Sequence, residues 1–157
     1  MKLYISEKIF SAHRKFYVTD ENNTNIFEIS SKILSFADKT YIKNMAGEEM
    51  VYIEQQLFHL TPNYNIYINN NLVCNISKKF QLLKNDYKLD NGYRIDGKFM
   101  MFDFSIFDPN DIKIATIKRK FISIGDKYEL TIDNEKDISL ALAIVVAIAN
   151  DINRNQR

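Results

Sequence analysis

The chain has 157 residues, of which 46% are hydrophobic and 13% aromatic, enough apolar material for one domain with a sizeable core. Twenty-one basic residues nearly balance 20 acidic residues, so the net charge of +1 excludes a strong overall field that would attract DNA, RNA or acidic membranes, and any anion site must be a local patch. The single cysteine, Cys74, excludes an intramolecular disulfide and favours a reducing, cytoplasmic compartment. Glu7 and Lys8 interrupt the N-terminal apolar residues, so we expect no export signal.

A pattern of one isoleucine, a lysine three residues later and a large apolar residue four residues later recurs along the chain. The copies are ISEKI from Ile5, ISSKI from Ile29, IEQQL from Ile53, ISKKF from Ile76, IDGKF from Ile95 and IKRKF from Ile117. Apolar residues alternate with polar ones around each isoleucine, which is typical of strands, and turn-forming residues separate the copies. The spacing of 19 to 24 residues predicts six hairpins, and therefore about twelve antiparallel strands, over residues 1–132.

Strict alternation turns the residue two places after each isoleucine toward the interior, together with the isoleucine itself. In several copies this residue is polar or charged: Glu7, Ser31, Gln55, Lys78 and Arg119. We expect a repeated β-bulge at this position to re-aim these side chains outward, and Gly97 in the fifth copy also suggests a bulge. The alternative is an inward-facing ionic site, which the cost of burying unpaired charge disfavours.

The C-terminal segment differs from the repeats, because residues 138–152 are apolar around nearly the whole circumference of a helix. Such a helix must be buried on all sides, and we expect a core helix over residues 135–152 with Asn134 or Asp137 as its N-cap. The apolar run 140–149 is too short for a transmembrane span, which needs about 20 residues. The β-branched residues 144–146 leave a strand as the alternative.

The predicted hairpins and helix suit one another in size. A closed barrel of about twelve strands is too wide for its own side chains to fill, since about eight strands is the limit for that. A helix about 10–12 Å across, apolar all round, fills such a lumen. The expected fold is therefore all-β with one helix: a closed antiparallel barrel around a buried, hydrophobic C-terminal helix.

Three segments carry a resemblance to a known family: MVYIEQQLFHLTPNYNIYIN at 50–69, IKRKFISIGDKYELTI at 117–132 and DISLALAIVVAIAND at 137–151. In order and spacing, the whole chain resembles the LURP-one-related family. This resemblance implies one domain over 1–157 with the fold of the Tubby C-terminal domain and the phospholipid scramblases, a twelve-stranded barrel around a hydrophobic helix. It also implies kinship with small bacterial members whose biochemical role is not established.

The family resemblance further suggests an anionic ligand. Tubby-like proteins bind phosphoinositides through basic surface residues, whereas the proline-rich, lipidated region and cysteine cluster of scramblases have no counterpart in this sequence. If the copies are equivalent, their lysines form a broken collar: Lys8, Lys32, Lys79, Lys98 and Lys120, with Gln56 in the sixth place. The candidate anion-binding residues, where neighbouring cations thicken one sector, are Lys78, Lys79, Lys118, Arg119 and Lys120. The alternative is that these charges only keep the strands soluble and unpaired at their edges.

We expect no catalytic, cofactor or metal site. His13 and His59 fall in turns without a cysteine or carboxylate at ligand spacing, and residues 108–111 (DPND) have the composition of a turn. Phosphate-binding and nucleophile motifs are missing. The repeat aromatics, Phe10, Phe36, Tyr64 and Tyr87, follow core positions and do not predict a platform for nucleic-acid bases.

These observations predict a non-enzymatic, cytoplasmic barrel, peripheral to a membrane, that binds an anionic partner. Phospholipid or phosphoinositide head groups are the expected ligands. The alternative is a protein-interaction or regulatory module with no small-molecule ligand.

Overall fold

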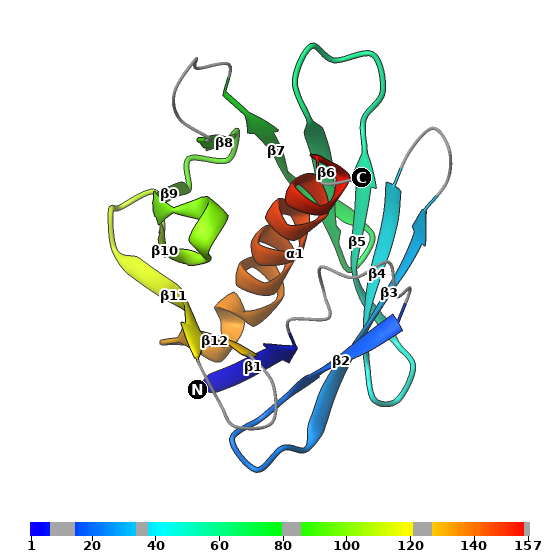
Figure 1. Cartoon of the computed structure of the whole chain (residues 1–157), viewed down its shortest axis with the longest axis vertical. Coiled ribbons are helices and arrows are strands. Elements are labelled where there is room, and N and C mark those ends of the chain that lie inside the picture. Colours follow the sequence, from blue (N-terminus) through cyan, green and yellow to red (C-terminus); the bar gives the residue numbers. More distant parts are fainter. Residues whose placement is uncertain (7–14, 34–37, 80–85, 121–126, 156–157) are drawn as a thin grey trace.

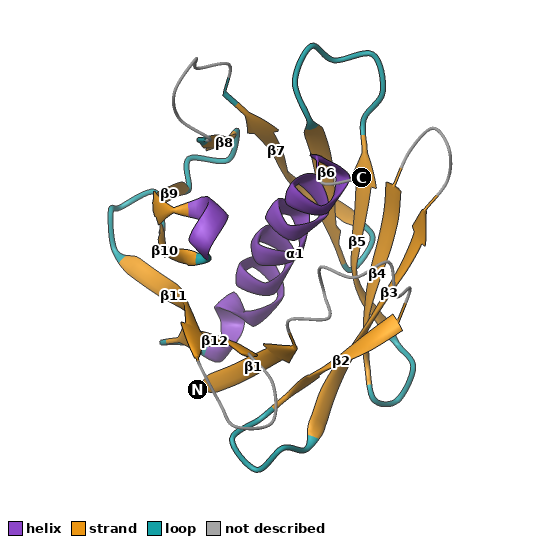
Figure 2. Cartoon of the chain, viewed as in Figure 1, coloured by secondary structure: helices purple, strands orange, loops and turns teal. Residues whose placement is uncertain are grey.

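The computed structural model describes residues 1–6, 15–33, 38–79, 86–120 and 127–155. Over these residues the chain forms one antiparallel sheet of twelve strands that curves around a single α-helix (Figures 1 and 2). The strands are β1 (Lys2–Ser6), β2 (Lys15–Thr19), β3 (Asn25–Ile33), β4 (Asp38–Asn44), β5 (Glu49–Gln55), β6 (Asn63–Ile68), β7 (Asn71–Lys78), β8 (Tyr87–Leu89), β9 (Arg94–Lys98), β10 (Asp103–Phe107), β11 (Lys113–Lys120) and β12 (Lys127–Ile132). Two 3-10 turns, η2 (Phe99–Met101) and η3 (Glu135–Asp137), and the helix α1 (Ile138–Asn155) complete the described elements.

The sheet follows the chain as a meander. Its strand order is β8-β7-β6-β5-β4-β3-β2-β1-β12-β11-β10-β9, so β1 pairs with β12 and the two end strands, β8 and β9, are consecutive in the chain. Among the described residues β8 and β9 share no ladder, so the barrel is nearly closed. The predicted antiparallel barrel of twelve strands around the C-terminal helix is confirmed.

The helix fills the lumen because its whole middle section is apolar. Every side chain from Ala141 to Ala149 is at most 1% exposed, and the strands contribute the alternating residues of their inner faces to the same core. The side chain of Asn134 accepts a hydrogen bond from the Lys136 backbone N–H (3.1 Å) and so caps the 3-10 turn η3, whereas α1 itself begins at Ile138, three residues after the predicted start. The helix reaches Asn155, three residues beyond the predicted end, and the alternative strand is wrong.

The meander gives the barrel two distinct rims. Odd-numbered strands end at one rim, and even-numbered strands begin there. The C-terminal end of α1 lies at the same rim, because Asn150 Nδ2 donates a hydrogen bond to Thr40 Oγ1 at the start of β4 (2.9 Å). We call this end the helix-C rim. The opposite end, where η3 and the N-terminal end of α1 follow β12, is the helix-N rim (Figure 1).

The expected bulge two residues after each isoleucine is wrong. The strand pairing is continuous through the residues in question, which are Ser31 on β3, Gln55 on β5, Lys78 on β7 and Arg119 on β11. The register shifts that do occur lie near the helix-N rim, for example between Ile42 and Lys43. Ser31, Gln55 and Lys78 therefore keep the phase of the preceding isoleucine, and Gln55 is buried. Glu7 lies outside the described residues.

Gly97 is not part of a bulge, because the β9–β10 pairing is continuous through it. It allows β10 to pack closely against β9. Its φ of +142° is a conformation that side-chain-bearing residues rarely adopt, and a Cβ added there would lie 2.4 Å from the carbonyl oxygen of Asp103. The sheet requires glycine at this position for both reasons.

Candidate anion-binding site

The structure separates the five predicted anion-binding residues into two groups. Lys78 and Lys79 stand at the helix-C end of β7, whereas Lys118, Arg119 and Lys120 form the end of β11. Three strands, β8, β9 and β10, lie between β7 and β11 around the barrel. The predicted residues therefore do not form one site, and each group has to be judged by its own surroundings.

The charge of Lys78 is directed into the barrel. Its Nζ lies 3.2 Å from Oδ2 of Asp151 on α1, a carboxylate with no exposed surface, and the Tyr87 hydroxyl donates to the same oxygen at 2.5 Å. Burial, reinforced by Asp151, raises the pKa of the Tyr87 phenol, which keeps it a neutral donor. The inward ionic site, which was the disfavoured alternative, is therefore the arrangement found here.

The same end of the lumen holds a second polar contact between the helix and the wall. Arg154 Nη1 lies 3.8 Å from Oδ2 of the buried Asp38 and donates to Oε1 of Gln55, which also accepts from the Asp38 backbone N–H at 3.3 Å. Together with the Asn150–Thr40 bond, these contacts connect the last two turns of α1 to the ends of several strands. Their evident role is to hold the helix in register inside the barrel.

Lys79 is on the outer surface, but it also has a carboxylate partner. Its Nζ lies 3.1 Å from Oδ2 of Asp86. Because Lys78 and Lys79 are both neutralised by a neighbouring acid, the β7 group offers little free positive charge to an anion.

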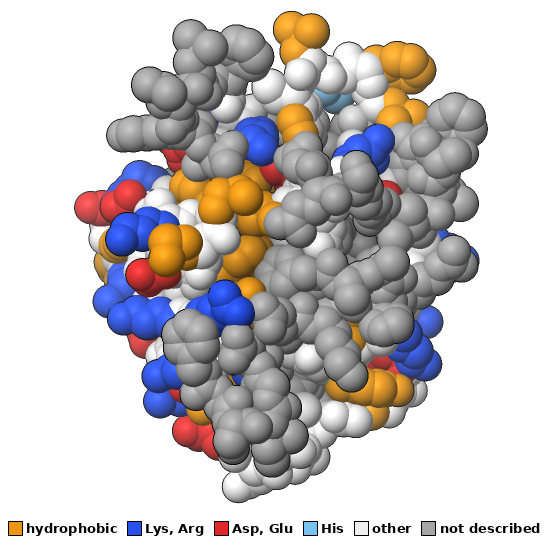
Figure 3. Space-filling view, in the orientation of Figure 1, with side chains coloured by type: hydrophobic (Ala, Val, Ile, Leu, Met, Phe, Trp, Pro, Cys, Tyr) orange, Lys and Arg blue, Asp and Glu red, His pale blue; other side chains and the backbone are white. Residues whose placement is uncertain are grey.

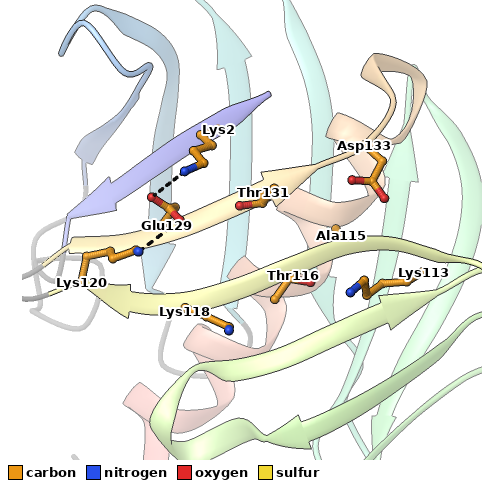
Figure 4. A pocket seen from close by; sticks show the side chains of 9 residues that line it. All are labelled: Lys2, Lys113, Ala115, Thr116, Lys118, Lys120, Glu129, Thr131 and Asp133. Carbon is orange, nitrogen blue, oxygen red and sulfur yellow. Dashed lines mark ion pairs between the residues drawn. The ribbon is translucent and has the colours of Figure 1, made fainter.

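The β11 group borders a hollow on the outside of the barrel (Figure 4). The hollow has a volume of about 340 Å³ and lies over β1, β12 and β11. Its lining residues are Lys2, Lys113, Ala115, Thr116, Lys118, Lys120, Glu129, Thr131 and Asp133. Alternation along β11 explains the arrangement, since Ile117 points to the core and thereby turns Lys118 outward. We call this hollow the lysine groove.

The lysine groove has an excess of positive charge, because four lysines face the two carboxylates of Glu129 and Asp133. Glu129 lies between Lys2 (3.7 Å from Nζ to Oε2) and Lys120 (3.5 Å from Nζ to Oε1), as Figure 4 shows. Lys113 and Lys118 form no ion pair with any residue that the structure describes. Their ammonium groups are therefore the most available to an added anion.

Arg119 stands outside the lysine groove. It pairs with Tyr128 in the β11–β12 ladder and shares the phase of the core residue Ile117, but it is exposed because β11 ends at the helix-C rim. Four lysines of the predicted collar are exposed: Lys32, Lys79, Lys98 and Lys120. Lys8 lies outside the described residues.

The remaining candidates for chemistry have ordinary surroundings. Cys74 is buried in the core, and burial raises the pKa of its thiol to about 12. His59 is exposed in the β5–β6 connection, and His13 lies outside the described residues. Among the residues described, no group of three or more His, Cys, Asp or Glu side chains is arranged to hold a metal ion. In the same part of the chain, no helix has the length and apolar character needed to cross a membrane.

The fold defines a class: twelve strands wrapped around a C-terminal helix, with a basic groove on the outer wall. The chain matches the LURP-one-related family over residues 1–149 and belongs to that family. The uncharacterized protein YxjI of Bacillus subtilis (strain 168) is 28% identical over 149 residues, which cover 94% of this chain and 91% of YxjI. An X-ray structure of an Arabidopsis thaliana protein is 18% identical and has a TM-score of 0.65, covering 98% of this chain and 91% of the plant chain. This likeness shows the shared fold.

Proposed function

We propose that the protein is a non-enzymatic module of the cytoplasm that binds the phosphate-bearing head groups of anionic phospholipids at a membrane surface, through the lysine groove. The observation that carries the proposal is the excess of positive charge toward the helix-C end of the lysine groove, where Lys118 has no carboxylate partner among the described residues and Lys120 shares Glu129 with Lys2. Phosphate oxygens are suitable partners for such ammonium groups.

The Lys118 end of the lysine groove is the better placed for a membrane surface, because it continues into Lys120 at the helix-C rim. A lysine near an anionic membrane contributes about 1 kcal/mol to binding. Two lysines therefore account for roughly a 30-fold change in affinity. Exposed charges are screened by salt over about 10 Å at 0.1 M, so binding should weaken as the salt concentration rises.

Co-sedimentation with vesicles tests the proposal. Neutral phosphatidylcholine vesicles are compared with vesicles that contain increasing phosphatidylserine or phosphoinositide, at low and near-physiological salt. We expect binding that rises with lipid charge, and that falls roughly 30-fold in the Lys118→Ala/Lys120→Ala variant. The matched control is Lys43→Ala/Lys136→Ala, which removes the same charge near the helix-N rim.

Equal losses in the two double variants would show attraction by net charge alone and would reject the lysine groove as the site. Absence of binding to every vesicle would reject the lipid ligand altogether. Salt-independent capture of a specific protein, without any vesicle binding, would establish the rival function of a protein-interaction or regulatory module.

A further inference from the structure

The β5–β6 connection carries two unusually exposed apolar side chains. Phe58 and Leu60 have relative exposures of 104% and 105%, so no part of either side chain is covered, and Leu57 beside them is 40% exposed. The other exposed large hydrophobic residues of the described chain range from 38% to 64%. Phe58 also has a φ of +65°, a costly conformation for an aromatic residue. We call residues 57–60 the apolar tip.

The apolar tip projects from the helix-C rim, because it connects the end of β5 to the start of β6. Figure 3 shows hydrophobic side chains standing out at the end of the molecule where Figure 1 places this connection. The turn η2, between β9 and β10, adds the exposed Met100 and Met101 to the same rim. The helix-C rim thus presents apolar side chains at two points of its circumference. The helix-N rim also has partly exposed ones (Met45, Leu72 and Ile112, 52–60%), so the full exposure of Phe58 and Leu60 is what distinguishes the helix-C rim.

The two rims also differ in charge. At the helix-C rim, the two outermost residues of the twelve strands include nine Lys or Arg and three Asp or Glu. At the helix-N rim, the two outermost residues of the twelve strands include five Lys or Arg and one Asp or Glu. The connections 20–24, 45–48, 90–93, 108–112 and 133–137 add nine Asp or Glu and one lysine, Lys136, so the helix-N rim holds ten acidic and six basic residues. The near-zero net charge of the chain therefore conceals a separation of charge along the barrel axis.

Apolar side chains that nothing covers, on a rim whose strand ends carry an excess of cations, fit an anionic lipid bilayer. The apolar tip can enter the boundary between head groups and acyl chains, while the surrounding lysines remain at the level of the phosphates. We propose that the helix-C rim faces the membrane with Phe58 and Leu60 inserted, and that the acidic helix-N rim faces away from it. This inference rests on the proposed function, since it takes the same bilayer as the ligand, and it adds the orientation and the inserting element.

Because the chain contains no tryptophan, a single Trp reports on its own position. The experiment compares Phe58→Trp with Leu72→Trp, a matched position at the start of β7 that is 58% exposed and lies at the helix-N rim. On addition of phosphatidylserine vesicles, we expect the emission of Phe58→Trp to shift to the blue and to be quenched by brominated acyl chains. The emission of Leu72→Trp should stay at the wavelength of the free protein.

The Phe58→Ser/Leu60→Ser variant provides a second measurement. Full burial of one such side chain accounts for roughly tenfold or more in affinity, so we expect vesicle binding to fall by at least about tenfold. The thermal midpoint should be unchanged, because fully exposed side chains make no core contact. The loss should persist at high salt, unlike that caused by Lys118→Ala/Lys120→Ala.

The outcomes separate the two proposals. An unshifted Phe58→Trp emission in protein that does sediment with vesicles would overturn insertion and leave the lysine groove intact. A shift of Leu72→Trp alone would reverse the orientation. A blue shift of Phe58→Trp that depends on protein concentration without lipid would assign the apolar tip to self-association. Absence of sedimentation with any vesicle would overturn both proposals.

Discussion

The Nζ of Lys78 lies 3.2 Å from Oδ2 of Asp151, which joins the end of β7 to the last turns of the central helix. The two partners differ in their access to water, since the Lys78 side chain is 18% exposed and that of Asp151 is fully buried. Removal of one partner from a buried pair leaves the other charge uncompensated, and this cost depends on whether the remaining charge can reach solvent.

We therefore expect Lys78→Met to be more destabilising than Asp151→Leu. Lys78→Met leaves a carboxylate that cannot reach water, and it should lower the free energy of unfolding by about 3–5 kcal/mol. Asp151→Leu leaves a lysine that can swing outward and a buried Tyr87 hydroxyl without its acceptor, which costs about 1–3 kcal/mol, so its total cost should still be the smaller of the two. Urea unfolding followed by circular dichroism measures both.

The double variant Lys78→Met/Asp151→Leu is the control for this pair. It removes both charges, and it should recover part of the stability lost in Lys78→Met, since the Tyr87 hydroxyl then lacks its acceptor. Strict additivity of the two single effects would show that the pair does not interact energetically.

The barrel and its helix could be predicted from the sequence because the signals are local. Alternation within each copy defines a strand, and an apolar segment of 15 residues at 138–152 defines a buried helix. The Lys78–Asp151 contact could not be predicted in the same way, because it depends on the rotation and depth of the helix in the lumen. Two hints were available: the inward phase of Lys78 and the isolated Asp151 in an apolar helix.

The lysine groove depends on non-local pairing, and this explains why the sequence predicted only part of it. Lys118 and Lys120 were predicted, but Lys2 joins them only because β1 pairs with β12 and β12 pairs with β11. Equivalence of the repeat copies wrongly suggested that Lys78 and Lys79 belong to the same site. The apolar tip was visible in the letters LFHL at 57–60, although its full exposure requires the structure.

Gly97 provides a second test of the barrel. An alanine there would place its Cβ 2.4 Å from the Asp103 carbonyl oxygen in a conformation with positive φ, so the β9–β10 pair would have to separate. We expect Gly97→Ala to lower the free energy of unfolding by about 3 kcal/mol. Gly47→Ala is the matched control: its φ is +84°, but no atom lies within 4 Å, so its cost should be about 1 kcal/mol. Similar losses in both variants would show that backbone conformation alone matters at Gly97.

Cys74 makes stability depend on pH in a defined direction. Burial raises the pKa of its thiol from 9.0 to about 12, so above pH 9 the unfolded chain releases a proton that the folded chain keeps. The unfolded state then binds fewer protons, and the free energy of unfolding falls as the pH rises, at up to about 1.4 kcal/mol per pH unit. The effect should level off near the folded pKa.

Urea unfolding of the wild type and of Cys74→Ala at about pH 8, 9 and 10 measures this dependence. We expect a smaller decrease in the variant over this interval. Above pH 10 the buried phenol of Tyr87, whose pKa is also raised, makes the free energy of unfolding fall further with rising pH in both proteins. Parallel pH profiles throughout would mean that the thiol does not titrate differently on unfolding.

Glu129 offers a gain-of-function test of the lysine groove. Its carboxylate lies within 3.7 Å of Lys2 and 3.5 Å of Lys120 and accepts a hydrogen bond from the Tyr4 hydroxyl at 3.0 Å. Glu129→Gln preserves the shape and removes a negative charge that competes with a bound phosphate. We expect affinity for anionic vesicles to rise about fivefold, which corresponds to about 1 kcal/mol, with a steeper dependence on salt. Binding to neutral vesicles should not change.

Glu28→Gln is the control, because Glu28 forms a similar cross-strand ion pair with Lys15 (3.0 Å) on β2 and β3, away from the lysine groove. Both variants add one positive unit to the net charge. If only Glu129→Gln strengthens binding, the phosphates lie among Lys2, Lys118 and Lys120. If both variants strengthen it equally, the membrane responds to total charge, and the lysine groove has no special part in binding.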